Sequence, residues 1–510
     1  MKRMKLALLL SIILTFLSAC STENSSKEEV NSSGDHLKEL TFLSNFPSET
    51  LDPHLNWTPL RAGMVETLVK MTEDLKLEPW LAEEWKSEDN GQTWIFKIRD
   101  DITFQNGNKL DGEAVKASLE RNIQVSEAMK ASLKIKSIRS EGQMVVIKTE
   151  QPLPQFPSEL VHPNTAIIDV SESKIEQSPV GTGPFKVVSY EANSKLVLDK
   201  YQGYWDGKVQ LDRATLTFNE DANARTLALQ AGDADIVYRP AIESLETLAT
   251  EQSNVITVVP SLRTHLLMYN MSNETLKDIN VRKAFDALIN RNEVVESIMA
   301  GQATVANGPF LPEFPFTPNY EVKSFGIDLA KKHLEAAGYE IKDGKALKDG
   351  KQLSLQLFTY SYRPELPLIA QLIQSNAKQI GINIEIQIVE NIDEYLSQNS
   401  DWGLATYSLN TAPRGDASYF LNSAYMVGGA LNPGHLKHDK LIEKINELNK
   451  TVDEGERNLI AKDAITIIDQ ERLHSFIVYP NNFAAYKNKV QNWNLSKSEF
   501  YVLTKDTGVK

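Results

Sequence analysis

The chain has 510 residues, which is enough for two to three domains, a large core and a ligand enclosed between lobes. With 41% hydrophobic and 24% charged residues, the composition is that of an ordinary soluble globular protein, so disorder is confined to an end. The formal net charge of −14 excludes nucleic acid as a partner, because phosphate binding requires a basic face.

The first twenty residues have the three-part build of an export signal. Met1–Lys5 is basic, Leu6–Leu17 is apolar but too short to span a bilayer comfortably, and Ser18–Cys20 follows. This ending looks like a bacterial lipobox, which implies cleavage before Cys20 and lipid modification of its sulfur; a chance cysteine in a cleaved signal is the alternative. Cys20 is the only cysteine, so we expect no disulfide, iron–sulfur cluster or thiol nucleophile.

The segment after the lipobox is predicted to be a flexible tether. Residues 21–37 are rich in Ser, Asn and Glu and almost without apolar residues, so they cannot pack into a core. Together with the export signal, this predicts an extracytoplasmic protein that is anchored to the cell membrane as a lipoprotein.

Predicted strands and helices alternate from Leu40 onward. Thr93–Arg99 alternates apolar and polar residues as a half-buried strand does, and Asp111–Ile123 has an N-cap candidate followed by apolar residues at helical spacing. Further strands are predicted at Glu39–Asn45, Met144–Glu150, Lys195–Lys200, Ala214–Asn219 and Leu353–Tyr360. Further helices are predicted at Asn223–Ala231, Val281–Asn290, Ile327–Ala337, Leu366–Ile380 and Lys440–Asn449. The order predicts an α/β protein with mixed sheets.

The stretch Gly181–Pro184 has two interpretations. A tight turn before a strand would use glycines that are free to take positive φ and a proline that fixes the next dihedral angle. A phosphate cradle is the alternative, but the lysine and the following helix of a P-loop are missing. We therefore expect a structural turn.

The sequence carries little support for an enzyme. The acidic pairs Asp100–Asp101 and Asp233 with Asp235 do not converge, because adjacent residues on a strand or turn point to opposite sides. No HExxH, GxSxG or CxxC motif is present. We expect a binding protein.

Several long blocks resemble one known family. They are Pro79–Ile123, Ser178–Tyr190, Gln202–Ile236 and Asn280–Phe310. The first closely resembles the signature of the family 5 extracellular solute-binding proteins, the receptor lipoproteins of peptide, nickel and opine ABC importers. The resemblance covers nearly all of the chain past the tether. It implies a two-lobed periplasmic-binding-protein-like fold with the ligand in the cleft between the lobes, and a hinge closure that an importer can sense.

The resemblance also implies lobe boundaries and partners. We expect lobe I at residues 38–272 plus 482–510, with an extra subdomain at 61–178, and lobe II at 273–481. The implied partners are the membrane permease subunits of an ABC importer, and we expect a monomer.

The stretch Thr411–Leu421 separates the ligand classes. In peptide-binding members of the family an aspartate here pairs with the ammonium group of the peptide, and Pro413 stands at that position. A peptide would therefore lose a charge-assisted contact of about 1.5–3 kcal/mol. Arg414 follows and favours a ligand that carries carboxylates. The alternatives are a displayed adhesion triplet, Arg414–Asp416, and a solvated loop.

A second candidate stretch is Ser261–Asn270, which resembles members of the nickel subgroup. Their ligands are metal chelates of histidine or of small amino-polycarboxylates, which implies that Arg263 grips a carboxylate and that His265 ligates the metal. A structural hydrogen bond is the alternative for His265. Some nickel-binding members carry a clamping arginine where this chain has Asn164, so we expect the clamp to come from Arg263 and Arg414.

The third candidate stretch is Leu51–Lys70, which lines the cleft mouth in the family. His54 would be a metal ligand, Trp57 a stacking wall and Arg61 another carboxylate clamp. The alternatives are a structural histidine, a packed tryptophan and a solvated arginine.

Three further residues complete the expected ligand site. Trp402 and Tyr407 flank a strand that enters the same wall and are expected to be aromatic lining. Asn481 lies at the expected return crossover and would hydrogen-bond to the ligand or to the hinge.

The combined prediction is a receptor for a nickel or other divalent metal chelate. The metal would be part of the transported ligand, with no intrinsic cofactor. An oligopeptide or dipeptide receptor of the same family is the alternative.

Overall fold

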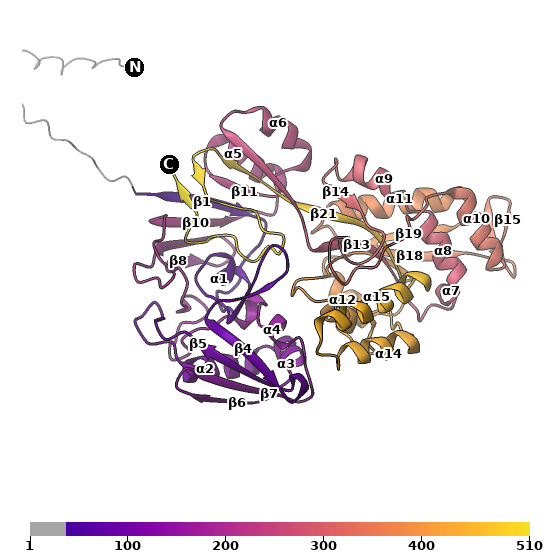
Figure 1. Cartoon of the computed structure of the whole chain (residues 1–510). Coiled ribbons are helices and arrows are strands. Elements are labelled where there is room, and N and C mark those ends of the chain that lie inside the picture. Colours follow the sequence, from indigo (N-terminus) through magenta and orange to yellow (C-terminus); the bar gives the residue numbers. More distant parts are fainter. Residues whose placement is uncertain (1–36) are drawn as a thin grey trace, which may run out of the picture. The chain divides into compact units, whose positions relative to one another are not determined.

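The computed structural model describes residues 37–510 (Figure 1). The predicted signal peptide, its lipidation site Cys20 and the tether up to residue 36 lie outside the described residues. Within residues 37–510, no helix combines the length and the apolar character needed to cross a membrane.

A mixed sheet of twelve strands runs through the described body (Figure 1). One half contains β1 (Glu39–Ser44), β8 (Phe185–Glu191), β9 (Lys195–Lys200), β10 (Arg213–Phe218), β11 (Ile236–Tyr238) and β12 (Asn254–Pro260). The other half contains β13 (Arg263–Tyr269), β14 (Ala303–Val305), β18 (Ser354–Thr359), β19 (Asn383–Ile388) and β20 (Leu404–Asn410). β1 is parallel to β10 and β11, and β18 is parallel to β19 and β20.

The long strand β21 (His474–Lys487) belongs to both halves of this sheet. Its first part pairs with β13 and β14, and its second part pairs with β12 and β11. The change of partner falls at Pro480 and Asn481, opposite the end of β12. Asn481 therefore lies where β21 changes its pairing partner, and the lobe bounds themselves stay a prediction.

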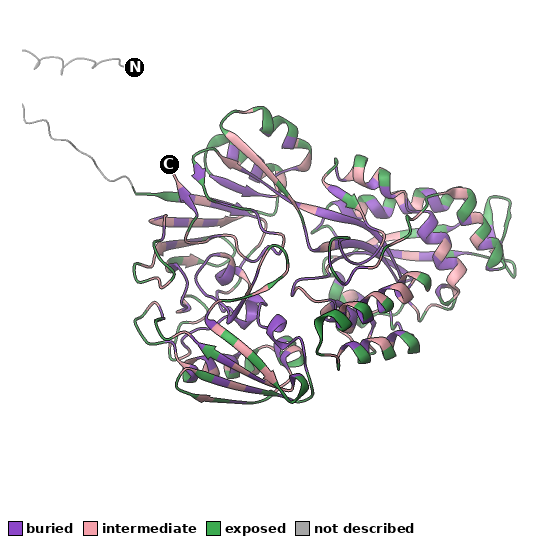
Figure 2. Cartoon of the chain, in the orientation of Figure 1, coloured by how far each residue is buried: buried purple, intermediate pink, exposed green. Residues whose placement is uncertain are grey.

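Helices cover the sheet and bury its apolar strands (Figure 2). The amphipathic helix α11 (Glu365–Gln379) packs against β18, β19 and β20, and α5 (Ala222–Ala231) packs against β11 and β21. Helix α10 (Ile327–Ala336) packs on α8 (Ile279–Ala287), and α14 (Asp439–Leu448) on α15 (Glu454–Gln470). Strand β20 is buried along almost its whole length, which is typical of a strand covered on both faces.

A separate antiparallel sheet has the strand order β4 (Ala82–Glu88), β5 (Thr93–Ile98), β7 (Met144–Thr149) and β6 (Ile135–Glu141). Helices α2 (Gly112–Val125) and α3 (Glu127–Leu133) accompany it. As predicted, β5 alternates buried and less buried residues, and the Asp111 side chain accepts a hydrogen bond from the backbone N–H of Ala114. This sheet lies within the range 61–178 predicted for an extra subdomain.

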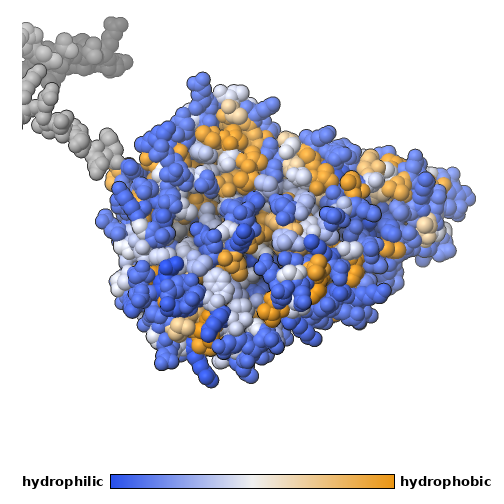
Figure 3. Space-filling model, in the orientation of Figure 1, coloured by the Kyte–Doolittle hydropathy of each residue, from blue (hydrophilic) through white to orange (hydrophobic). Residues whose placement is uncertain are grey.

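The remaining elements are short. The helices are α1 (Thr58–Arg61), α4 (Phe156–Glu159), α6 (Leu245–Thr250), α7 (Glu274–Lys277), α9 (Arg291–Glu293), α12 (Ile392–Gln398) and α13 (Ser418–Tyr425). The strands are β2 (Val69–Met71), β3 (Leu77–Pro79), β15 (Glu340–Lys342), β16 (Lys345–Lys348), β17 (Lys351–Gln352), β22 (Val490–Gln491) and β23 (Gly508–Val509). The face of the molecule in Figure 3 is mostly hydrophilic, in agreement with the composition.

The turn before β8 is structural, but for a different reason from the predicted one. Gly181 and Gly183 do not have positive φ. A Cβ atom on Gly181 would lie 2.4 Å from the carbonyl oxygen of Met64, and one on Gly183 would lie 2.4 Å from that of Gly63. The two glycines are required because another backbone segment passes against them.

Candidate functional site

Four arginines and two glutamates from distant parts of the chain form the candidate site. We call this group the arginine–glutamate cluster, and its members are Arg61, Arg239, Arg263, Arg363, Glu365 and Glu499. They come from the end of α1, the residue after β11, the start of β13, the start of α11 and the C-terminal segment after β22. The fold thus gathers charges that are spread over most of the sequence.

Glu499 pairs with two of the arginines. Its Oε1 lies 3.5 Å from Nε of Arg263, and its Oε2 lies 3.9 Å from a terminal nitrogen of Arg61. Nε of Arg61 also donates a hydrogen bond of 3.0 Å to the Glu499 backbone carbonyl. Burial raises the pKa of Glu499, but the arginines around it outweigh this and hold the pKa at about 2. The carboxylate is therefore ionised at neutral pH.

The backbone of Glu499 is held in an unusual conformation. Its φ is 63°, in the left-handed region, which costs a non-glycine residue about 1–3 kcal/mol and persists only where the surrounding structure imposes it. The preceding segment is fixed by Asn482, whose Nδ2 donates to the carbonyl oxygens of Ser496 and Lys497. The next residue, Phe500, packs edge-on against Trp57 at 5.5 Å. The fold imposes this position on the carboxylate.

Glu365 joins the cluster to His265. Oε1 of Glu365 lies 3.0 Å from Nε2 of His265 and 3.4 Å from a terminal nitrogen of Arg239. Burial raises the pKa of Glu365, yet the His265 hydrogen bond and the neighbouring arginines lower it far below its ordinary value. Burial also lowers the pKa of His265 despite its Glu365 partner, so His265 is neutral at pH 7 and donates from Nε2 to the carboxylate.

The other ring nitrogen of His265, Nδ1, makes no hydrogen bond within residues 37–510. The side chain is fully buried. A neutral histidine that donates one N–H to a carboxylate presents its other nitrogen as a lone pair, which is the usual arrangement of a metal-ligating histidine. The geometry is therefore suitable for the role expected of His265.

Arg363 is the guanidinium of the cluster without a direct partner. It is 7% exposed, and within the described chain its side chain makes no hydrogen bond or ion pair. Burial lowers its pKa, but Glu365 and Glu499 outweigh this and raise it. Arg363 is therefore charged, and its donors are available to a ligand.

The charges of the cluster do not balance. Four guanidinium groups face two carboxylates, so two positive charges are in excess, and the neutral His265 adds none. Buried, uncompensated charge is costly, and an anion that enters the site relieves that cost. The arrangement can bind a ligand with two carboxylates through bidentate guanidinium contacts.

Aromatic rings border this cluster. The guanidinium carbon of Arg61 lies 4.0 Å from the ring centre of Phe46 and 5.1 Å from that of Trp57. Nε1 of Trp57 donates a 3.0 Å hydrogen bond to the side-chain oxygen of Asn164. The structure thus places Trp57 beside Arg61, and uses Asn164 to orient Trp57.

Tyr407 lies near the same group. It packs against Tyr360 with ring centres 6.0 Å apart, and its hydroxyl donates to Asp393. Burial raises the pKa of Tyr360 to about 12, so this hydroxyl stays protonated. In the strand register Arg263 is opposite Asn410, whose side-chain oxygen is buried without a hydrogen-bond partner.

Arg414 is placed elsewhere. It is 3% exposed, forms an ion pair with Glu159 and donates a 2.6 Å hydrogen bond to Ser132. It also lies 4.3 Å from the ring centre of Tyr419. The alternatives of a displayed adhesion triplet and of a solvated loop are wrong, because Arg414 is buried. The carboxylate that it binds in this structure belongs to the protein.

Two predicted ligand residues have structural roles instead. Nδ1 of His54 accepts from Arg121 at 2.8 Å, and Nε2 lies 3.1 Å from the carbonyl oxygen of Ala166, to which it donates. No ring nitrogen of His54 is free for a metal. Trp402 is fully buried and packs among the apolar residues of the hydrophobic core.

Four members of the site could not be expected from the sequence. Arg239, Arg363, Glu365 and Glu499 were not predicted, because isolated charged residues in a sequence look like solvated surface. One local signal existed: in Arg363–Glu365 two charges flank a proline between a strand and an amphipathic helix. No comparable local pattern marks Glu499.

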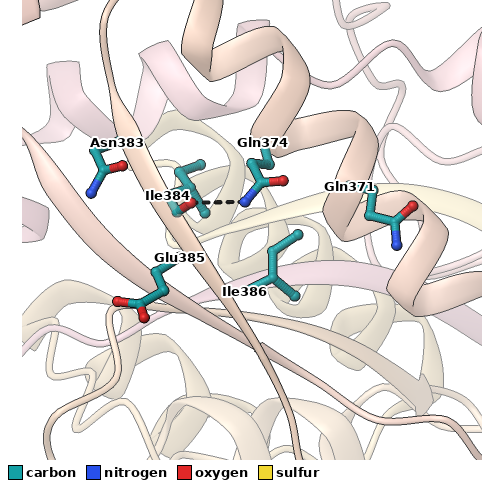
Figure 4. A pocket seen from close by; sticks show the side chains of 6 residues that line it. All are labelled: Gln371, Gln374, Asn383, Ile384, Glu385 and Ile386. Atoms are coloured by element: carbon teal, nitrogen blue, oxygen red, sulfur yellow. Dashed lines mark hydrogen bonds between the residues drawn. The ribbon is translucent and has the colours of Figure 1, made fainter.

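A surface hollow does not coincide with this site. It has a volume of about 690 Å³ and is lined by Gln371, Gln374, Asn383, Ile384, Glu385 and Ile386, from α11 and β19 (Figure 4). Gln374 donates a 2.8 Å hydrogen bond across it to the carbonyl oxygen of Ile384. Gln374, Asn383 and Glu385 already make side-chain hydrogen bonds within the protein, and the hollow shares no residue with the arginine–glutamate cluster. Within residues 37–510, no three or more His, Cys, Asp or Glu side chains are grouped to hold a metal ion.

Comparison with known proteins gives consistent matches. Residues 76–431 match the profile of the bacterial extracellular solute-binding proteins, family 5 Middle. The nickel-binding protein NikA of Staphylococcus aureus is 34% identical over 511 residues, which is 100% of each chain.

Two solved structures extend the likeness. A nickel ABC transporter structure from Bacillus halodurans is 48% identical, with a TM-score of 0.80 over 92% of this chain and 100% of that one. The structure of Staphylococcus aureus NikA in complex with Ni(L-His)2 is 34% identical, with a TM-score of 0.82 over 93% of this chain and 100% of that one. The predicted fold class is confirmed.

Proposed function

Because this chain belongs to the family 5 bacterial extracellular solute-binding proteins, we propose that it is the substrate-binding receptor of an ABC importer. It captures a nickel or other divalent metal chelate of histidine or of a small amino-polycarboxylate, and delivers the chelate to the membrane permease. The metal arrives as part of the ligand. The protein acts outside the cytoplasmic membrane as a monomer, held by a lipid on Cys20, and catalyses no reaction.

The observation that carries the proposal is the excess of two positive charges in the arginine–glutamate cluster, whose side chains are buried or partly buried. A chelate of two amino acids brings two carboxylates, which matches that excess. The full-length relative that is 34% identical is named a nickel-binding protein, and its solved complex contains nickel with two histidines.

Each residue has a role in this proposal. Arg61, Arg263 and Arg363 grip the carboxylates, and Arg363 contributes most because no protein group competes for it. Nδ1 of His265 ligates the metal, and Glu365 orients the imidazole.

Some of the expected residues keep a supporting role, and others are not retained. Trp57 and Tyr407 form aromatic walls beside the ligand, and Asn481 serves the crossover. His54 and Trp402 are not ligand residues in this proposal, because their polar groups or surfaces are used inside the protein.

Calorimetric titration tests the proposal with three probes: nickel alone, nickel with L-histidine, and an oligopeptide mixture. The expected result is tight binding only when metal and histidine are both present. Arg363→Ala is expected to weaken that binding by about 2–4 kcal/mol, because a ligand carboxylate would be left buried and unpaired. Arg139→Ala is the matched control, since Arg139 is exposed on β6 and outside the cluster. Tight binding of peptides without metal would overturn the proposal and show that the protein is a peptide receptor.

A further inference from the structure

Glu499 is a carboxylate in a site that is built to bind carboxylates. Its side chain is 3% exposed, and its Oε2 accepts no hydrogen bond from residues 37–510. Nε of Arg263, on the other side of this ion pair, donates no hydrogen bond either, although it lies 3.5 Å from Oε1. An unsatisfied acceptor and an unsatisfied donor therefore lie side by side in a buried place.

Such a pair calls for a ligand with complementary groups. Buried polar atoms are almost always hydrogen-bonded, so an unsatisfied donor and an unsatisfied acceptor side by side in a cluster of excess positive charge point to groups that arrive with a ligand. The guanidinium donors of Arg263 and Arg363 require a carboxylate, and Oε2 of Glu499 requires an N–H. These two groups are attached to the same carbon in every α-amino acid.

When the amine coordinates a metal, only a chelator whose nitrogen still carries hydrogen can offer both a carboxylate and an N–H. A primary amine that binds a metal through its lone pair still carries two N–H bonds. The tertiary amine of a fully substituted amino-polycarboxylate has none, and each additional carboxylate would face the fixed negative charge of Glu499. Like charges at close range repel each other strongly in a buried site.

The fold fixes the Glu499 carboxylate in place, so it cannot move away from an additional ligand carboxylate. Its backbone has a φ of 63°, and Asn482 holds the preceding carbonyl oxygens. Arg61 binds both its backbone carbonyl and its side chain. The carboxylate is therefore a fixed part of the site, which is what discrimination between ligands requires.

We propose that Glu499 determines the specificity of the receptor: it accepts a hydrogen bond from the metal-bound amine of an amino-acid chelate and rejects chelates whose nitrogens are fully substituted. This rests on the proposed function and narrows its ligand class from two kinds of chelator to one. Histidine chelates are accepted, and amino-polycarboxylates with tertiary nitrogens are excluded.

The first experiment compares two chelates in the full-length protein by calorimetric titration. Nickel with L-histidine is expected to bind at least about tenfold more tightly than nickel with nitrilotriacetate, whose nitrogen is tertiary. Glu499→Gln is expected to reduce that preference at least about tenfold, since it removes the charge while keeping the shape. Glu321→Gln, an exposed residue outside the cluster, is the control and is expected to leave the preference unchanged.

The second experiment changes the ligand and needs no variant. Wild-type protein is titrated with nickel plus N,N-dimethyl-L-histidine, in which the α-amine carries no N–H. Binding is expected to be at least about tenfold weaker than with L-histidine after correction for the stability of each chelate. If Glu499→Gln does not fold, this titration of the wild-type protein alone tests the specificity role of Glu499.

The outcomes separate the two proposals. Failure of every nickel chelate to bind would overturn the proposed function. Binding of the histidine and nitrilotriacetate chelates with equal affinity, or an unchanged preference in Glu499→Gln, would overturn the specificity role while leaving the receptor function intact.

Discussion

The guanidinium group of Arg414 pairs with the carboxylate of Glu159 and thereby joins the loop after β20 to helix α4. Both side chains are buried, and Ser132 at α3 accepts a further hydrogen bond from Arg414. The same loop packs tightly at Gly415, where a Cβ atom would lie 2.7 Å from the carbonyl oxygen of Leu75. Two independent contacts thus fix this loop against the N-terminal part of the body.

Removal of Arg414 tests that relationship. Arg414→Ala leaves the Glu159 carboxylate buried without its partner, so the free energy of unfolding is expected to fall by about 3–5 kcal/mol. Urea denaturation followed by circular dichroism measures the loss. Arg414→Met combined with Glu159→Gln is expected to recover part of it, because the uncompensated charge is gone.

The same variant separates two hypotheses about the ligand. If Arg414 only bridges two parts of the protein, Arg414→Ala keeps most of the affinity for the nickel–histidine chelate under conditions where it is folded. Arg263→Ala is expected to lose most of that affinity. If the two variants lose the same affinity for the chelate, Arg414 binds a ligand carboxylate as Arg263 does.

Glu365 is expected to act on the metal through His265. Glu365→Gln removes the carboxylate that orients the imidazole, and such changes typically reduce metal affinity by about 10–100-fold. Titration with nickel plus histidine gives the affinity, and the visible absorption of the bound nickel reports its ligands. A changed affinity with an unchanged absorption spectrum would mean that His265 does not ligate the metal.

Stability is expected to fall as the pH is lowered from 7 to 5. Burial lowers the pKa of His54, His162 and His474 to about 4, about 4 and about 3, and that of His265 below its ordinary value. In this range the unfolded chain takes up protons that the native histidines refuse, so unfolding is favoured by about 1.4 kcal/mol per pH unit for each histidine.

One buried carboxyl group opposes this trend. Burial raises the pKa of Glu66 to about 7, despite hydrogen bonds from Tyr204, Trp205 and Thr182. Between pH 7 and about 4.5 the native state therefore holds a proton that the unfolded chain releases, which offsets one histidine. The net effect is still a loss of stability on acidification. Scanning calorimetry at pH 7, 6 and 5 would contradict this if the melting temperature stayed constant.

The turn before β8 gives a prediction about packing. Gly183→Ala is expected to destabilise the protein by about 1–3 kcal/mol, because its Cβ would overlap the backbone at Gly63. Gly326→Ala is the control, since the nearest atom to its Cβ would be 3.4 Å away and its backbone is extended. The urea midpoints of the two variants measure the difference.

The fold class was predictable because local patterns agree with the global structure. The alternation in Thr93–Ile98 matches the buried face of β5, and Asp111 caps α2 as its position indicates. Helix α15 was not predicted, although its signal was present: Asp453 caps it, and Ile460, Ala464 and Ile468 are buried at helical spacing.

The candidate site was only partly predictable. Arg61, Arg263 and His265 were expected and lie at the arginine–glutamate cluster, because the family resemblance marks their segments. The partners Glu365 and Glu499 come from segments far along the chain, and no local pattern reports which distant charges a fold brings together. For the same reason the sequence alone could not reveal that Glu159 neutralises Arg414.

The continuity of β21 has a mechanical consequence. Since one unbroken backbone carries hydrogen bonds for both halves of the sheet, the halves cannot slide past each other without breaking the ladder. Any rotation between them must be concentrated in the few backbone torsions near Pro260 and Pro480, and both prolines have restricted φ. The restricted φ of these two prolines is therefore expected to limit how far the two halves of the sheet can rotate about the crossover.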